Sequence, residues 1–136
     1  MFENINTSHI AVPAILLSLV LLATPSYAEW LYIADNIESD VYYIETEKIN
    51  SKNGYVYYDM LVNYEKPNNG AKSVISNHVG NCQTNEMKYN SDKYFSKQTG
   101  KGTFIGGSSI ADVSWLTLPI GSAFSNVQRY ACEKLN

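Results

Sequence analysis

The alternation of apolar and polar residues along the chain predicts a series of short β-strands. It is clearest over residues 55–64, YVYYDMLVNY. Because successive side chains of a strand point to opposite faces, the even-numbered residues of this segment form an apolar face and the odd-numbered residues a mixed one. We expect the even face to lie on the core and the odd face to be partly solvated, as in many antiparallel sheets.

Shorter segments rich in tyrosine and β-branched residues predict further strands. Residues 30–34 and 41–45 form two of them, and residues 46–50 follow as a turn or one short helical turn. After a Pro-Asn-Asn-Gly turn, residues 72–82 form a strand. Its even-numbered residues, from Val74 to Cys82, share one face if no bulge intervenes.

Between this strand and the C-terminus, short apolar runs alternate with turn residues. We expect residues 87–89 and 93–96 to be the two arms of a hairpin that turns at residues 90–92. Residues 100–112 hold four glycines, which predicts either a mobile loop or a sheet edge. Residues 113–118 predict a last strand.

One helix is predicted at the C-terminus. Gly121 and Ser122 mark its start, with Ser122 as the N-cap that accepts a hydrogen bond from a free backbone N–H. Apolar residues then recur at helical spacing: Phe124, Val127, Tyr130 or Ala131, and Leu135. The predicted fold class is therefore α+β, with an antiparallel sheet and one C-terminal helix packed on one face.

Residues 1–28 are predicted to be a signal peptide for export. Residues 10–23 are almost continuously apolar, but they are too few to cross the roughly 30 Å hydrocarbon core of a bilayer as a helix. Ser26 and Ala28 are small residues of the kind that a signal peptidase requires before its cut. We expect cleavage after Ala28, leaving a single domain of residues 29–136 in the periplasm or the medium. That domain is expected to have no membrane span and, with no cysteine near the cut, no lipid anchor.

Cys82 and Cys132 are the only two cysteines. An exported chain meets an oxidising compartment, which favours a disulfide between them. Two free thiols would need a reducing compartment, and a metal pair would need further ligands, of which the exported part offers only His78. We expect a Cys82–Cys132 bond that ties the helix to the strand ending at Cys82.

Charge argues against a nucleic-acid partner. All ten basic residues and twelve of the thirteen acidic residues lie in residues 29–136, which gives this part a formal charge of −2. Acids gather in residues 29–47 and lysines in residues 66–101. Either the acidic and basic strands pair and neutralise one another, or the lysines form a face for an acidic or polyanionic partner.

No group of residues matches a catalytic, metal or cofactor site. His78 has no nucleophile motif beside it, and we expect it to be hydrogen-bonded in or near the core. Asp35, Glu38 and Asp40 cluster in a predicted turn, where solvated acids are common, instead of forming a catalytic pair or a known calcium loop. We therefore expect no enzymatic activity, no metal and no cofactor.

Surface residues remain as candidates for binding. Tyr55 and Tyr57 lie on the mixed face of residues 55–64, where Tyr42 or Tyr43 of a neighbouring strand could complete an aromatic patch. These tyrosines could equally pack against the polar hairpin or a second subunit. The lysines of the candidate surface are Lys88, Lys93, Lys97 and Lys101.

Aromatic, cysteine and turn residues follow a distinctive order along residues 29–133. They are Trp30, Tyr32 and Ile33, the Val41 to Ile44 strand, the Tyr55 to Tyr64 strand, Cys82, Trp115, the Pro119 to Ser122 helix entry and Cys132. In this order and spacing the chain resembles the surface-adhesin protein E family of exported bacterial domains. The resemblance implies a sheet of about six antiparallel strands with a C-terminal helix fixed by a disulfide. The best-known member is a lipid-anchored adhesin that binds host matrix and serum proteins, and this chain departs from it in lacking the lipid-attachment cysteine.

Two functions follow as hypotheses. The first is an exported, non-enzymatic, adhesin-like binding module that contacts a host or extracellular protein, or a polyanion. The alternative is a periplasmic structural or assembly protein that acts as a homodimer through an open sheet edge.

Overall fold

The structure is a computed structural model that describes residues 27–109 and 114–136. Its elements are β1 (Trp30–Asp35), β2 (Val41–Glu45), η1, a 3-10 helix (Thr46–Lys48), β3 (Asn50–Lys52), β4 (Tyr55–Asn68), β5 (Ala71–Asn81), β6 (Glu86–Phe95), β7 (Phe104–Ser109), β8 (Leu116–Thr117) and α1 (Ala123–Lys134). Nearly all of the predicted signal peptide, residues 1–28, lies outside the described residues.

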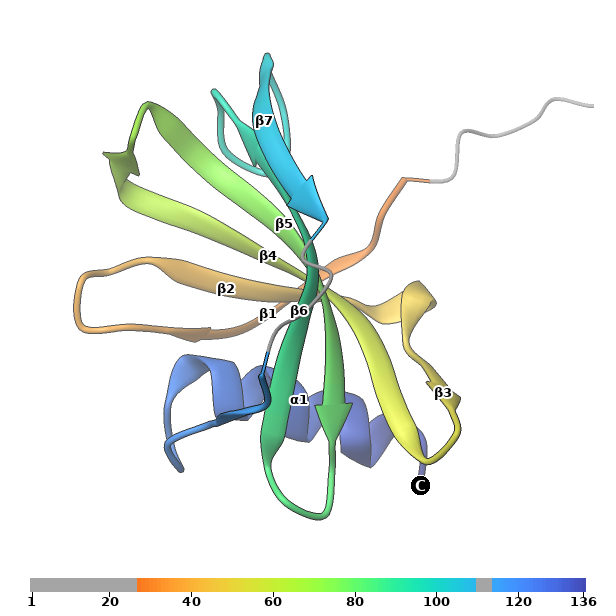
Figure 1. The fold of residues 1–136 in the computed structure, drawn as a ribbon. Coiled ribbons are helices and arrows are strands. Elements are labelled where there is room, and N and C mark those ends of the chain that lie inside the picture. Colours follow the sequence, from red (N-terminus) through yellow and green to blue (C-terminus); the bar gives the residue numbers. More distant parts are fainter. Residues whose placement is uncertain (1–26, 110–113) are drawn as a thin grey trace, which may run out of the picture.

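A single antiparallel sheet carries the fold. Six strands follow the order β1-β2-β4-β5-β6-β7, while β3 pairs with β4 and β8 with β6. Helix α1 packs on one face, where it contacts β1, β2 and β4, and β7 lies at the end of the sheet remote from the helix (Figure 1). The predicted fold class is confirmed. The sequence pattern missed β3, because three residues are too few to show an alternation.

The core lies between α1 and the facing side of the sheet, which we call the core face. Its members are all nearly inaccessible to solvent: Tyr42, Ile44, Val56, Tyr58, Met60, Val62, Val74, Val127 and Ala131. The even-numbered residues of β4 supply four of them, and Tyr64 packs at the margin, so the predicted core face of this strand is confirmed.

The opposite side of the sheet, the outer face, is less solvated than the alternation predicts. Leu61 belongs to this face and is fully buried. The segment between β6 and β7 covers it, because Thr99 N donates to Asn63 Oδ1 at 2.7 Å and Gly100 N donates to Ser73 Oγ at 3.0 Å. A small second core therefore forms on the outer face.

The predicted hairpin at residues 87–96 is wrong. This segment is one continuous strand, β6, which pairs along its length with β5. The register shifts between Ser91, opposite Asn77, and Tyr89, opposite His78, so that Asn90 is an extra residue in a β-bulge. Asn90 Nδ2 donates to Asn77 Oδ1 at 2.9 Å, which holds the bulge against β5. The polar residues that signalled a turn instead form this irregularity.

Two other segments differ from their predicted form in extent. Residues 100–112 were predicted to be a loop or a sheet edge. Within this range the structure has an edge strand, β7, paired with β6. Residues 110–112 lie outside the described part. The last predicted strand, residues 113–118, is reduced to the two residues of β8, and Val113 again lies outside the described part.

The acidic and lysine-rich strands do not pair directly. The acids of residues 29–47 lie on or beside β1 and β2, whereas β5 and β6 lie on the other side of β4. The ion pair recorded among the described residues is between Lys48 Nζ and Asp59 Oδ2, 3.7 Å apart, and Lys48 is largely exposed. The lysines are therefore not positioned by pairing with the acidic residues of β1 and β2.

Helix α1 begins and docks largely as predicted. Ser122 is the N-cap, since its Oγ accepts a hydrogen bond from Ser125 N at 3.2 Å. Val127 and Ala131 are fully buried against the sheet. Leu135, predicted on the same stripe, is instead the C-cap and is 41% exposed, because the helix ends at Lys134 before its side chain reaches the core.

The predicted disulfide is confirmed. Cys82, directly after β5, and Cys132, on α1, are bonded with their Cα atoms 5.8 Å apart, and the bridge closes a separation of 50 residues in sequence. It fixes the C-terminal half of the helix to the sheet.

Removing this bond should lower the stability of the domain. On the loop-entropy relation, a bridge across about 50 residues contributes about 4 kcal/mol to the free energy of unfolding, a large fraction for a small domain. We expect a Cys82→Ser/Cys132→Ser variant to lose stability of this order in guanidinium unfolding. Reductant should destabilise the wild type and leave the variant unchanged; an equal response of the two proteins would contradict the assignment.

Candidate binding surface

Three of the candidate residues, Tyr55, Tyr57 and Lys88, lie on the outer face of the sheet, at the end that carries β8. Tyr57 of β4 is in register with Val79 of β5, which is in register with Lys88 of β6. A tyrosine, an apolar residue and a lysine thus form one row across three central strands. Central strands are held on both sides, so this row is a rigid part of the domain.

Trp115 forms a cluster with Tyr55 and Lys88 that the sequence pattern did not predict. Its ring packs on Tyr55, with centroids 5.3 Å apart and ring planes at 32°, and Lys88 Nζ lies 4.7 Å from the centroid of the same indole. We call Tyr55, Lys88 and Trp115 the Trp115 cluster. All three side chains are half-buried. The cluster presents flat aromatic surface beside a positive charge, a combination common at protein interfaces.

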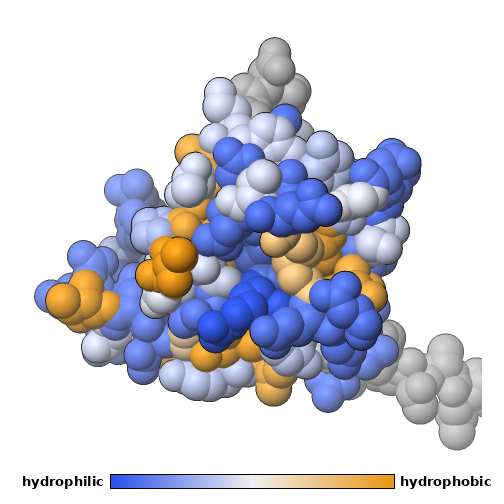
Figure 2. All heavy atoms as spheres, turned by 90° about the horizontal axis from the view of Figure 1, so that it is seen from below, coloured by the Kyte–Doolittle hydropathy of each residue, from blue (hydrophilic) through white to orange (hydrophobic). Residues whose placement is uncertain are grey.

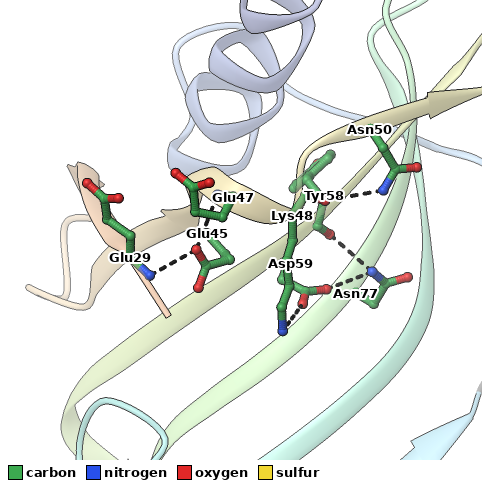
Figure 3. Close-up of polar contacts among 8 residues, drawn as sticks. All are labelled: Glu29, Glu45, Glu47, Lys48, Asn50, Tyr58, Asp59 and Asn77. Carbon is green, nitrogen blue, oxygen red and sulfur yellow. Dashed lines mark hydrogen bonds and ion pairs between the residues drawn. The ribbon is translucent and has the colours of Figure 1, made fainter. Parts of the chain in front are cut away.

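A polar row crosses the outer face next to this cluster. Lys48 Nζ approaches Asp59 of β4, whose Oδ1 accepts a hydrogen bond of 2.7 Å from Asn77 Nδ2 of β5 (Figure 3). The row continues to Asn90 in the bulge of β6. Because each amide and carboxylate has a partner from a neighbouring strand, this row orders the surface beside the aromatic cluster.

The other predicted lysines gather at a second place. Lys93 of β6 is in register with Ile75 of β5. Ile75 is four residues from Val79, so Lys93 lies about 13 Å along the strands from the row that contains Lys88. Lys97 and Lys101 lie in the turn that follows β6, where Lys97 N donates to Lys101 O at 3.1 Å. The structure therefore divides the candidate surface into the Trp115 cluster with Tyr57, and a lysine group of Lys93, Lys97 and Lys101.

The sequence suggested that Tyr42 or Tyr43 of β2 could join Tyr55 and Tyr57 in an aromatic patch. In the structure neither does. Tyr42 is in the core against Phe124, with ring centroids 5.3 Å apart, and Tyr43 packs on Tyr32 of β1 at 6.1 Å. Register explains this, because β2 pairs with the part of β4 from Met60 to Asn63. Trp115 takes the expected place.

The surface on the helix side is mainly polar. Seen from below, the side on which α1 lies in Figure 1, the surface is mainly hydrophilic, and hydrophobic residues form separate patches (Figure 2). In the part of the chain that the structure describes, no helix has the length and apolar composition needed to cross a bilayer.

His78 is buried, as predicted, but it is not hydrogen-bonded. It is fully inaccessible on the core face, packed against the rings of Tyr58 at 5.2 Å and Tyr89 at 4.8 Å between centroids. Neither ring nitrogen has a hydrogen-bond partner among the described residues. Burial lowers the pKa of His78 to about 3, so the imidazole is neutral near pH 7 and has no access to a substrate in solution.

Neither of the two phenols that pack on His78 forms a hydrogen bond with it. The Tyr58 hydroxyl, the nearest phenol on β4, donates instead to Gln128 Oε1 of α1 at 3.1 Å. Burial raises the pKa of Tyr58, and it raises that of Tyr89 to about 12, so both phenols stay protonated. His78 is therefore enclosed by aromatic rings of the core.

The acidic turn between β1 and β2 has a structural role. Asn36 Oδ1 accepts hydrogen bonds from Glu38 N and Asp40 N, and Asp40 Oδ1 accepts one of 2.9 Å from Glu65 N on β4. Within residues 27–109 and 114–136, no three His, Cys, Asp or Glu side chains gather as a metal site would require. Asp40 therefore serves to tie the β1–β2 turn to the sheet.

Comparison with known proteins places this arrangement in a family. The profile of surface-adhesin protein E matches residues 30–133. The chain belongs to the surface-adhesin protein E family. Its fold is similar to that of Haemophilus influenzae protein E, with a TM-score of 0.58 at 21% sequence identity, covering 82% of this chain and 91% of that one. A second crystal form gives 0.56, at 21% identity, covering 82% and 94%, and the protein from non-typeable H. influenzae gives 0.52, at 21% identity, covering 82% of each chain. No curated protein sequence matches.

His78 should make this surface-adhesin protein E domain sensitive to acid. Below about pH 6.5 the unfolded chain binds a proton at His78 that the folded chain does not bind until about pH 3, so the free energy of unfolding falls as pH falls. The expected slope is up to about 1.4 kcal/mol per pH unit near 25 °C. It should be visible in urea unfolding between about pH 6 and pH 4.

His78→Phe is the matched variant, because it keeps an aromatic ring in the pocket and cannot bind the proton. We expect its stability to fall less steeply than that of the wild type over the same interval. Parallel slopes in the two proteins would show that His78 does not titrate in the way its burial requires.

Proposed function

We propose that this protein is an exported, non-enzymatic binding module, adhesin-like in function, that contacts an acidic protein or a polyanion through the outer face of its sheet. The observation that carries the proposal is the Trp115 cluster, in which an indole and a phenol lie partly exposed beside the Lys88 ammonium. Membership of the surface-adhesin protein E family supports it.

The cluster has the properties of a binding site more than of a packing contact. Trp115 keeps part of its surface in solvent, so its indole is available to a partner. Aromatic rings of this kind supply most of the energy of many interfaces, since they bury a large area and lose little conformational entropy. Lys88 adds an attraction for carboxylate or sulfate groups of the partner.

The lysine group extends the same preference along the sheet. Lys93, Lys97 and Lys101 are exposed, and no carboxylate of the described residues lies within ion-pair distance of their ammonium groups. Unpaired lysines attract a polyanion over a range set by the ionic strength. Binding through both groups should therefore weaken as salt rises.

The chemistry of the interior supports a role without catalysis. His78, the best candidate for acid and base work, is fully buried and neutral, and the acids of the β1–β2 turn are engaged in holding that turn. Both cysteines are used in the disulfide, so neither is available to carry a lipid. We propose that the protein is exported, either to the periplasm or out of the cell.

Retention on immobilised heparin and on matrix proteins, at two salt concentrations, tests the proposal. We expect the wild-type domain to be retained at low salt and released at higher salt. A Trp115→Ala/Lys88→Gln variant should bind about tenfold more weakly or worse, because it removes both the aromatic anchor and its charge.

The control is Lys134→Gln, which removes an exposed lysine from α1 on the helix side. It should bind as the wild type does. Equal losses in the control and in the Trp115 variant would point to net charge alone, and absence of any salt-sensitive retention of the folded wild type would sink the proposal.

A second candidate function is assembly as a homodimer. Strand β7 pairs with β6 on one side, and no strand of the described residues pairs with its other side. It exposes Phe104 and Ile105, which are 58% and 48% accessible. An open edge with apolar side chains can add a strand from a second copy.

Sedimentation of the wild-type domain and of an Ile105→Lys variant tests this alternative. Assembly through β7 predicts a dimer for the wild type and a monomer for the variant, because charge on an edge strand opposes pairing. A wild type that stays monomeric at high concentration removes the assembly hypothesis and leaves the binding module.

A further inference from the structure

Glu45, at the end of β2, is a carboxylate inside the protein. It is 1% exposed. One oxygen, Oε1, accepts hydrogen bonds from Glu29 N at 2.9 Å and from Glu47 N at 3.2 Å (Figure 3). The other oxygen, Oε2, is buried and has no donor among the described residues. No cation of the described residues lies within ion-pair distance of it. A buried carboxylate with one unpaired oxygen and no such cation is costly, so its presence calls for a cause.

Glu29, the donor to Glu45, is held firmly on both sides of its backbone. Its carbonyl oxygen accepts hydrogen bonds from Thr46 N at 3.1 Å and from Thr46 Oγ1 at 3.4 Å. The next residue, Trp30, begins β1 opposite Glu45. The position of the Glu29 nitrogen over the carboxylate is therefore determined by the sheet itself.

The two residues before Glu29 are outside this framework. Tyr27 is 84% exposed, Ala28 is exposed, and neither belongs to a strand. Among the described residues, the hydrogen bonds that join the N-terminal segment to the sheet thus begin at Glu29, directly after the Ala28–Glu29 bond. The sequence predicts that a signal peptidase cuts this same bond.

We propose that hydrolysis of the Ala28–Glu29 bond creates an α-ammonium group at Glu29 and that Glu45 is its built-in counter-ion. The peptidase adds one water across the peptide: the C–N bond breaks, Ala28 keeps the hydroxyl as a carboxylic acid, and the amine takes up the proton that this acid releases. The products at neutral pH are a carboxylate on Ala28, which leaves with the signal peptide, and an ammonium on Glu29.

The ammonium can satisfy both oxygens of the Glu45 carboxylate, which the amide cannot. Before cleavage the Glu29 nitrogen has one hydrogen, which goes to Oε1. After cleavage it has three, so it can also serve the unpaired Oε2, and its charge offsets the buried carboxylate. The exposed carboxylates of Glu29 and Glu47 lie at the same corner and favour a cation there as well (Figure 3). Removal of the signal peptide therefore stabilises the folded domain directly.

A comparison of two chains tests this ion pair. The first, residues 29–136 with a free amine at Glu29, carries the charge beside Glu45. The second, residues 27–136, keeps Glu29 as an amide and moves the charge two residues away. We expect the first to melt at a temperature higher by about 4 °C or more, as for a difference in stability of about 1 kcal/mol in a domain of this size, with intact mass confirming each N-terminus.

Two substitutions separate the ion pair from other effects of the extension. In a Glu45→Gln background the difference between the two chains should vanish, whereas in a Glu47→Gln background it should remain. Equal melting temperatures of the two wild-type chains, or a difference that survives Glu45→Gln, would overturn the proposal.

Reactivity of the amine gives a second test that needs no substitution. An amine-reactive reagent at neutral pH should label Glu29 of folded 29–136 at least about tenfold more slowly than the N-terminus of 27–136, because an ammonium in an ion pair gives up its proton reluctantly. Equal labelling rates would contradict the proposal. The protein purified after export should also begin at Glu29, and a different N-terminus would refute the processing step while leaving the outer-face binding experiments unaffected.

Discussion

The docking of α1 across the sheet is the constraint on which the rest of the domain depends, and a buried glutamine defines it. Gln128 Nε2 donates to Asn81 O and Glu86 O, on either side of the β5–β6 turn, while its Oε1 accepts from the Tyr58 hydroxyl. The fit is close, since a Cβ at Gly80 would lie 2.5 Å from that Oε1. Hydrophobic burial is not directional, whereas these three hydrogen bonds are, and they favour this position of the helix. The disulfide four residues further along the helix then fixes the same position covalently.

That docking separates the two faces of the sheet into different kinds of surface. On the core face, the rings of Tyr58 and Tyr89 pack on His78, which is neutral and has no hydrogen-bond partner among the described residues. The outer face has no helix over it, and it is covered in part by the segment after β6 and in part by Trp115. The residues proposed for binding thus lie on the partly exposed outer face, on strands whose opposite face packs in the core.

Local patterns predicted what local physics controls. The alternation in β4, the Ser122 cap and the pairing of two cysteines in an oxidising compartment each depend on a few neighbouring residues, and all three are confirmed. The failures depend on contacts distant in sequence. Asn90 lies in a bulge because Asn77 binds it, Leu61 is buried because a loop about 40 residues away folds over it, and Trp115 reaches Tyr55 across the sheet. These contacts cannot be predicted from the spacing of residues along the chain. The pattern also indicated that His78 is buried, but not that its ring nitrogens have no hydrogen-bond partner among the described residues.

The bulge at Asn90 decides which side of the molecule is positively charged. Lys88 and Lys93 are five positions apart on one strand, and an odd separation in a regular strand puts side chains on opposite faces. The one extra residue between them reverses this parity, so that both lysines project outward, in register with Val79 and Ile75. It also keeps Tyr89 and Tyr94 together on the core side, opposite His78 and Val74. A chain lacking Asn90 would have to bury an ammonium or expose a tyrosine, and the charge pattern of the outer face therefore rests on a single backbone irregularity.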